Sequence, residues 1–478
     1  MPDENELRAQ LKRLGDELDR RVPIVSTLDD RYDGGYPLPP LVQEAKVTRA
    51  YRTLMDLAGS NWAKLIVDSV EERLEIQGIR FGDGQADEQA WDIFQSNGLD
   101  AESSMLHQST LTDARAYAIV WGDGATDPEP KVTLEHASLC VCEYEAGSRR
   151  KAAAALRRWK DGKRWYANLY RPEAIYKFQS QSDGDEIPVE AQSWVRREPD
   201  GEQWPLVNPF GDVPVVEFAV NRTLRPARFG TGVGEFEPNL RHMDRINYKM
   251  FCGLVALTWS GFPLRALIGD PILRDDDGKP LKPFDVVASE LVQIENPDGK
   301  LVQLPEAKID NYSPEMDIKH LAALTKTPAS YLLPGMINLS DDAIRGMERA
   351  LVAKAKRHHR SLGEAWEDVV RLALRVKDPD DPRGRDQSAQ IIWTDPESRS
   401  LAERADAAVK LDAIGIPKGV IMSKVLGMTP QEIARAKTEG GDDILESLMR
   451  ANGTENEPVV NQQSDAVDPA RGNGAGNE

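Results

Sequence analysis

The feature that most constrains this chain is a long proline-free run in its C-terminal third. No proline occurs from Asp341 to Val376, and apolar residues recur three or four positions apart, as on one face of a helix. Ser340 supplies an N-cap, and the two aspartates after it favour the positive end of the helix dipole. At roughly 1.5 Å per residue, a helix over 341–376 spans about 54 Å. Its apolar stripe consists of Ile344, Met347, Leu351, Leu362, Trp366, Val369 and Ala373.

The rest of the chain predicts an α+β protein with several domains. Its 478 residues exceed what one ordinary core accommodates. Residues 4–21 carry leucines at helical spacing, and short β-like runs between Gly and Asp turns fill residues 117–220. The second pattern predicts a mainly antiparallel sheet packed on helices. Further helices are predicted over residues 61–78, 86–96, 100–116, 236–257, 314–325, 397–413, 417–426 and 430–449, and a short strand over 391–393.

Turn residues and composition mark the remaining segments. Prolines and Asp-Gly turns punctuate residues 262–306, which predicts a small β-rich module inserted between two helices. Pro328, Pro334 and Gly335 predict a loop before the long helix. The segment after residue 450 is rich in Asn, Gly, Asp and Glu, and too few apolar residues remain to offset the entropy of ordering it. We therefore expect a disordered tail.

The charge of the chain restricts how it meets DNA. The formal net charge is −19, with 40% hydrophobic and 29% charged residues. Proteins that wrap DNA neutralise phosphates with clustered Lys and Arg, which argues against that function here. An acidic surface instead suits a protein past which DNA slides, because like charges suppress lasting contacts. No apolar run is long enough to span a bilayer and the N-terminus lacks the order of a signal peptide, so we expect a soluble chain that stays in a cytoplasm.

The sequence contains no recognised enzyme motif. It lacks the phosphate-binding loop G-x-x-x-x-G-K-[ST], H-E-x-x-H and G-x-S-x-G. The glycines at 230, 232 and 234 indicate a turn rather than a dinucleotide site, because no parallel βαβ unit accompanies them. His136 lies four residues before Cys140, which is a weak metal-binding pattern, and thiols lining a buried strand at Cys140 and Cys142 are the simpler interpretation. We therefore predict no catalytic residue, no cofactor and no metal.

The middle of the long helix is basic. Lys354, Lys356, Arg357 and Arg360 surround two adjacent histidines, which point to different sides of a helix and so do not form a ligand pair. A solvated or interface-facing surface is the simpler interpretation of these residues. The alternative is a specific contact with DNA or with a neighbouring subunit.

Several short motifs occur in an order that resembles a known family. They are Tyr32-Asp33-Gly34-Gly35; Asn61-Trp62 with Val67-Asp68-Ser69-Val70-Glu71-Glu72-Arg73-Leu74 and Gly78-Ile79-Arg80; Phe229-Gly230-Thr231-Gly232 before Asp244-Arg245-Ile246-Asn247; and Leu333-Pro334-Gly335 followed by Ser340-Asp341-Asp342-Ala343-Ile344-Arg345. Together with the long helix and a helical C-terminal domain, this order resembles the portal proteins of siphoviruses, especially the group similar to the portal of the Bacillus phage SPP1 and its actinobacteriophage relatives. The resemblance covers nearly the whole chain.

The resemblance implies a portal fold and a division of the chain into segments. An N-terminal helical arm would cover residues 1–26 and an α/β wing 27–231. Two stem helices, over 232–261 and 307–327, would enclose a clip over 262–306. The remaining segments would be a tunnel loop over 328–340, a long wing helix with a return strand over 341–396, a helical crown over 397–450 and the tail over 451–478.

The resemblance also implies a function. Portal proteins of this family form a closed ring, usually of twelve subunits, through which double-stranded DNA is packaged and ejected without sequence specificity. The implied partners are the terminase large subunit, a head–tail adaptor, and the major capsid and scaffolding proteins, with no membrane involved. The ring would initiate capsid assembly in the host cytoplasm and occupy the unique vertex of the virion. The residues implied to line the channel are Tyr331, Leu332, Leu333, Pro334, Gly335, Met336 and Asn338, the first three as an apolar tip.

Two other functions stay open at this point. Another phage head connector or a scaffold-type ring protein would share the composition and the oligomeric state. A DNA-processing enzyme with an unfamiliar site belongs to a different class, and its signature would be a basic groove beside a tight carboxylate cluster.

Overall fold

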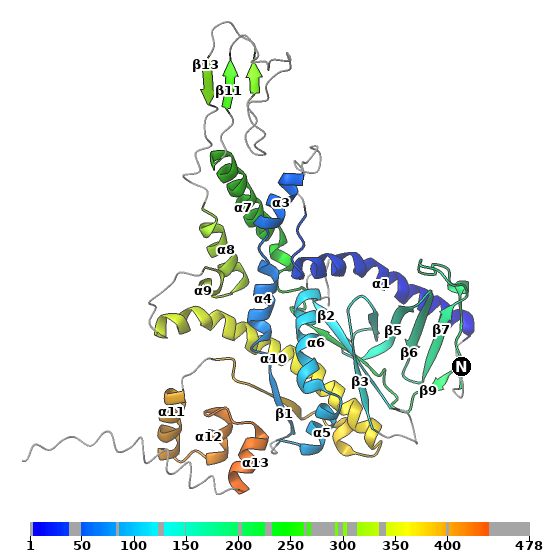
Figure 1. Ribbon diagram of the computed structural model, residues 1–478. Helices are drawn as coiled ribbons and strands as arrows, with labels where there is room; N and C mark the ends of the chain where they lie inside the picture. The colour runs from blue at the N-terminus through cyan, green and yellow to red at the C-terminus, as the bar shows by residue number, and fades with distance from the viewer. Residues whose placement is uncertain are drawn as a thin grey trace, which may run out of the picture. The chain divides into compact units, whose positions relative to one another are not determined.

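The computed structural model describes residues 3–37, 49–82, 86–122, 129–148, 150–198, 203–224, 232–261, 265–268, 292–294, 300–303, 313–333, 341–397 and 401–438. The chain divides into two compact units, Met1–Ser398 and Arg399–Glu478, and each is described by itself. Helices and antiparallel sheets are both abundant in the first unit, which confirms the α+β class (Figure 1).

The helix predicted from the proline-free run is present as α10 (Asp341–Lys377), 37 residues long. It passes through the main core of the first unit, where Leu351, Leu362 and Trp366 are buried (Figure 1). The Trp366 ring packs edge-on against Phe94 and Phe218 at centroid distances of 5.3 and 4.8 Å. The apolar stripe of α10 is therefore part of the core, as its spacing predicts.

Two antiparallel sheets occupy the predicted β region. Their strands are β2 (Arg115–Trp121), β3 (Lys131–Glu135), β4 (Cys140–Tyr144), β5 (Ala152–Asp161), β6 (Arg164–Tyr170), β7 (Ala174–Ser180), β8 (Trp194–Arg196), β9 (Leu206–Val207) and β10 (Val215–Ala219). The larger sheet has the order β4-β5-β6-β7-β8, with β9 paired to β7, and the smaller one has the order β10-β2-β3. Tyr117 of the smaller sheet and Tyr170 of the larger one belong to a buried cluster that joins the two sheets.

Helix α1 (Glu4–Tyr32) lies along the larger sheet (Figure 1). The predicted end at residue 21 is wrong, because the helix continues through Pro23. The continuation places Val25 and Leu28 on buried positions, and the Thr27 hydroxyl donates to the Pro23 carbonyl at 2.8 Å. The predicted leucine stripe is confirmed, since it packs on the sheet through Leu7, Leu11, Leu14 and Leu18.

Three short helices complete the main core beside α10. They are α4 (Trp62–Glu71), α5 (Glu88–Ser96) and α6 (Leu99–Asp113). The last two are close to the predicted ranges, but the predicted end of the first at residue 78 is wrong, because the chain forms a strand from Ile76 onward. Strand β1 (Ile76–Phe81) pairs antiparallel with β14 (Ala389–Trp393), so the strand predicted near residue 391 returns to the start of the unit.

Helices α7 (Leu240–Gly261) and α8 (Glu315–Thr325) occupy the two predicted stem segments. Helix α3 (Arg49–Ala58) packs on α7 through Met55, Ala58 and Phe251, and the sequence analysis did not anticipate it. Between α7 and α8, strands β11 (Arg265–Ile268), β12 (Val292–Ile294) and β13 (Lys300–Gln303) form a small sheet, as the turn pattern predicts. The other residues of that module lie outside the described ranges.

The second unit is helical, as predicted. It contains α11 (Leu401–Ala413), α12 (Lys418–Lys424) and α13 (Pro430–Thr438), with Ile421 and Met422 buried. The predicted tail over 451–478 lies outside the described residues. Among the helices of the described ranges, none is both long and apolar enough to cross a bilayer.

Candidate functional site

Three of the motifs meet where α1, α4 and α7 converge. Asn61 caps α4, since its Oδ1 accepts from the Lys64 backbone N–H at 3.0 Å, while its Nδ2 donates to the Tyr32 carbonyl at 2.7 Å. Next to it, the Trp62 indole N–H donates to Asn247 Oδ1 at 2.9 Å, in a buried position. Motifs far apart in the sequence thus bond directly to one another, which explains why these polar residues occur together.

The end of α1 completes this junction. Arg31 forms an ion pair with Asp244 of α7 at 2.9 Å and donates to the Gly35 carbonyl at 3.2 Å. The Tyr32 hydroxyl donates to Asp68 of α4 at 2.7 Å. The chain then turns at Gly34, whose φ of +95° is a conformation that residues with a Cβ rarely adopt. These contacts fix α7 to the end of α1 and to the start of α4.

Helices α7 and α8 are joined by Asp317 near the start of α8. Its carboxylate pairs with Arg245 at 2.9 Å and with Lys249 at 2.5 Å, both on α7. The hydrogen bond from Lys249 is the main reason why the pKa of Asp317 lies below its usual value. The Asp317 backbone carbonyl also lies 2.8 Å from His242 Nε2. One carboxylate therefore holds α7 and α8 side by side.

The predicted tunnel loop begins as a folded segment. Lys326, with φ +57°, ends α8, and a short helix α9 (Ala329–Leu332) follows Pro328. The prediction that Tyr331, Leu332 and Leu333 form an exposed apolar tip is wrong for Leu332, which is 4% exposed in the main core, and Leu333 also packs partly against that core. Leu332 is buried because α9 turns its side chain inward. The predicted tunnel residues Pro334, Gly335, Met336 and Asn338 lie outside the described residues.

Polar contacts anchor α9 to the wing and to the long helix. Arg73 donates to the Tyr331 hydroxyl at 2.9 Å, and that hydroxyl donates to Glu348 of α10 at 2.9 Å. Arg73 also pairs with Glu348 at 3.4 Å, and both of these side chains are largely buried. Tyr331 is thus the outer member of a three-residue cluster. Sequence reasoning did not identify Arg73 or Glu348, because neither lies near the loop in the chain.

The predicted basic surface of α10 is divided by burial. Lys354 is buried and pairs with Glu235 at 3.0 Å, and His358 Nε2 lies 2.8 Å from the other oxygen of the same carboxylate. Burial alone would raise the pKa of Glu235, but the His358 hydrogen bond and the Lys354 charge outweigh it and hold the pKa far below its ordinary value. Lys354 is therefore engaged within the subunit.

The remaining basic residues of this segment are more exposed. Lys356, Arg357 and Arg360 are exposed, and Arg357 donates to Asn221 Oδ1 at 2.8 Å. Asn221, at φ +49°, also donates to Glu235 at 2.8 Å. One signal in the sequence could have indicated this network, namely an Asn just after a β-strand, because Asn tolerates the left-handed conformation.

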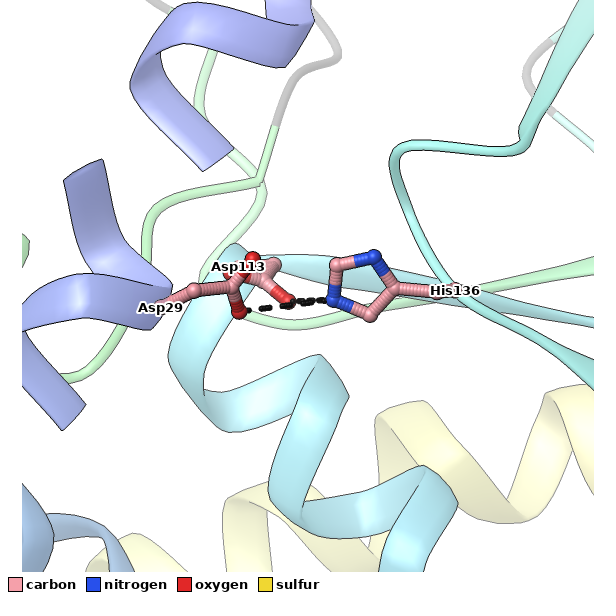
Figure 2. Close-up of side chains that lie close together, drawn as sticks. All are labelled: Asp29, Asp113 and His136. Atoms are coloured by element: carbon pink, nitrogen blue, oxygen red, sulfur yellow. Dashed lines mark ion pairs between the residues drawn. The ribbon is translucent and has the colours of Figure 1, made fainter. Parts of the chain in front are cut away.

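The glycines and cysteines have structural explanations. A Cβ at Gly232 would lie 2.5 Å from the Ala114 carbonyl oxygen, so this glycine permits close backbone packing, which favours the turn interpretation. Cys140 and Cys142 are buried in β4, which confirms their predicted place in a strand. His136 does not meet Cys140 and instead lies against Asp29 and Asp113 (Figure 2).

The ordered motifs, the helix pair α7 and α8 and the long helix α10 together define a phage portal protein. Residues 11–444 match the family described as phage portal protein, SPP1 Gp6-like, and the chain belongs to this family. This result confirms the resemblance recognised in the motifs.

Relatives of known identity agree with this assignment. The portal protein of Mycobacterium phage D29 is 30% identical over 409 residues, covering 82% of this chain and 77% of that protein. The portal protein of Mycobacterium phage L5 is 29% identical over 383 residues, covering 76% of this chain and 74% of that protein.

Among solved structures, a chain from the virion of a native gene transfer agent particle has a TM-score of 0.41 at 11% identity, covering 84% of this chain and 99% of that chain. A chain from the neck of the native particle has a TM-score of 0.42 at 12% identity, covering 78% and 92%.

Proposed function

We propose that this chain assembles into a closed ring of twelve subunits that forms the channel for packaging and ejecting double-stranded DNA. The observation that carries the proposal is membership in the portal family, across residues 11–444. The same membership favours a portal over another head connector and over an enzyme. The ring occupies the unique vertex of the virion after initiating capsid assembly in the host cytoplasm.

Each segment has a proposed role in this ring. The small sheet between α7 and α8 belongs to the clip, which binds the terminase large subunit during packaging and the head–tail adaptor afterwards. The helices of the second unit form the crown inside the capsid. The wing contacts the major capsid and scaffolding proteins. The segment after α9, residues 334–340, faces the DNA, and the Arg73–Tyr331–Glu348 cluster anchors its N-terminal end.

Exposed apolar side chains on the stem helices support ring formation. Leu257, Met316 and Leu324 are 59%, 62% and 59% exposed in the single chain. Large apolar side chains that stay exposed on two helices joined through Asp317 favour contact with another chain. In a closed ring, each subunit would cover these side chains on its neighbour, and no subunit would be left with an unpaired interface.

The formal charge of −19 per subunit supports passage of DNA rather than storage on the protein surface. Phosphates repel an acidic channel wall, so few long-lived contacts form. The proposed ring has no need of sequence recognition, and energy for translocation would come from the terminase.

Negative-stain electron microscopy and mass measurement of the purified protein test the proposal. We expect rings with a central hole, and we expect Met316→Glu with Leu324→Glu to abolish them while circular dichroism stays unchanged, because buried carboxylates oppose packing. Val189→Glu, at a 70% exposed site on the wing, is the matched control and should keep the rings. A parent protein that stays monomeric across salt and concentration would contradict the proposal.

A further inference from the structure

Three ionisable side chains from separate elements meet beside the end of α6 (Figure 2). Asp29 belongs to α1, Asp113 is the last residue of α6, and His136 follows β3. His136 Nε2 lies 2.8 Å from Asp113 Oδ2 and 3.4 Å from Asp29 Oδ1. One ligand atom from each of the three residues lies within 4.8 Å of the other two.

We propose that Asp29, Asp113 and His136 bind one divalent transition-metal ion, with Zn²⁺ as the best-fitting ion. Zinc takes imidazole and carboxylate ligands at about 2.0–2.1 Å, so ligand atoms around a tetrahedral ion lie about 3.3 Å apart. The two distances from His136 already bracket this value. Three protein ligands also leave the fourth position to a water molecule.

The state of Asp113 is the second observation that points to an ion. Its side chain is fully buried, and its Oδ1 has no hydrogen-bond partner among the described residues. The other oxygen, Oδ2, receives the Ser109 hydroxyl at 3.3 Å. A buried carboxylate oxygen without a partner is costly and calls for an explanation. A metal ion bound by both oxygens of Asp113 would satisfy it, and Oδ1 would then take the position that a water molecule holds when Asp113 binds through Oδ2 alone.

The surroundings of His136 suit a metal ligand. Its Nδ1 lies 2.8 Å from Ser138 Oγ and accepts from the Ser138 backbone N–H at 3.3 Å. Metal binding through Nε2 places the ring proton on Nδ1, which then donates to Ser138 Oγ and gives up the longer contact with the Ser138 backbone N–H, while the Nε2 proton leaves to solvent. The Asp29 side chain is 41% exposed and provides a path from solvent.

The composition of the site selects the ion. An imidazole favours zinc and other late transition metals, whereas Mg²⁺ favours oxygen ligands and its own waters. A bound ion would tie α1 to α6 and to the smaller sheet, and so stabilise the attachment of the N-terminal helix. The sequence predicted no metal here because only His136 and Cys140 are close in the chain; the fold supplies two aspartates instead.

The test uses the full-length protein, stripped with EDTA and dialysed. Calorimetric titration with ZnCl₂ at pH 8 and elemental analysis should give one Zn²⁺ per chain. Zn²⁺ should raise the melting temperature, since it binds the folded state, while Mg²⁺ at the same concentration should not. Absence of bound zinc in the stripped and titrated parent would overturn the proposal and leave a metal-free ion triad.

Variants at the exposed ligand separate metal binding from folding. Asp29→Asn should weaken Zn²⁺ binding by about tenfold or more, and Asp29→His should largely restore it because imidazole is also a ligand. Asp16→Asn is the matched control, on the same helix with a 54% exposed side chain, and should bind normally. Unchanged zinc affinity in Asp29→Asn and in a folded His136→Gln variant would also overturn the proposal.

Discussion

Lys354 and Glu235 are charged groups removed from water, which costs several kcal/mol for each ion. Their side chains are 3% and 4% exposed, and their 3.0 Å ion pair is supplemented by His358 and Asn221. The carboxylate thus receives contacts on both oxygens. At the residue scale, this network fixes the middle of α10 against the segment that leads into the first stem helix, because neither charge is satisfied without the other.

Glu235→Gln should lower the free energy of unfolding by about 3 kcal/mol, because it leaves Lys354 buried without a counter-charge. Urea unfolding measures the change. Lys356→Met is the matched control on the same helix, and as an exposed substitution it should stay within about 0.5 kcal/mol of the parent. Equal effects of the two substitutions would show that the buried pair does not stabilise the fold.

The same variant has a defined pH dependence. Because the pKa of Glu235 is depressed in the folded state, its contribution is fully present above the ordinary value of 4.5 and is lost as the pH falls below it. The difference in unfolding free energy between parent and Glu235→Gln should therefore shrink as the pH is lowered from 6 through 4. A difference that grows on acidification would contradict the assigned direction.

At the scale of elements, α9 divides the segment predicted as a loop into residues that belong to the subunit body and residues that follow it. Leu332 lies in the core and Tyr331 bonds to Arg73 and Glu348, so the first turn after Pro328 belongs to the subunit body. For residues 334–340, which lie outside the described ranges, the role of facing DNA stays a prediction. A test that replaces Leu332 and Leu333 together would confuse the two, because it opens a cavity in the core.

Leu332→Ser should destabilise the subunit by about 2–5 kcal/mol, as expected for truncating a buried leucine, and should lower the yield of rings. Met336→Ser should leave the melting temperature and ring formation unchanged but impair packaging or retention of DNA. Thermal melting, electron microscopy and a nuclease-protection packaging assay measure these three properties. Normal packaging by Met336→Ser rings would remove the support for a gating role of this segment.

Sequence analysis predicted the helices and strands that are determined by neighbouring residues. It missed the features that depend on contacts between residues far apart in the chain. The apolar stripe of α10 and the turns between β-strands depend on residues close together in the chain. Helical periodicity predicted the first, and Gly, Pro and Asp residues predicted the second. Helix α1 passes Pro23 because Val25 and Leu28 find a core to pack on, a tertiary effect that no local rule contains. Glu235, which pairs with both His358 and Lys354, lies 123 residues before His358 in the chain. Local sequence therefore indicated a surface charge at Lys354, although this side chain is buried.

At the scale of the whole molecule, net charge and uncovered apolar faces point to the same organisation. The acidic surface disfavours wrapping DNA, while Leu257, Met316 and Leu324 need covering. The described residues of a single chain leave these apolar side chains exposed to solvent. The proposed closed ring would cover these side chains between copies, and its net negative charge would limit lasting contacts with DNA, so one assembly accounts for both properties.

The C-terminal segment should contribute neither to folding nor to ring formation. Residues 455–478 lie beyond the family match at 11–444, and valines are their largest apolar residues. Ordering this segment would cost about 1–2 kcal/mol per residue, which three valines do not offset. Deleting 455–478 should shift the melting temperature by less than about 2 °C and keep the rings. A deletion from residue 418 onward is the contrasting variant, since it removes the buried Ile421 and Met422 and should unfold the second unit. A loss of many degrees on the shorter deletion would mean that the tail packs on the protein, because only new burial of surface can produce such a change.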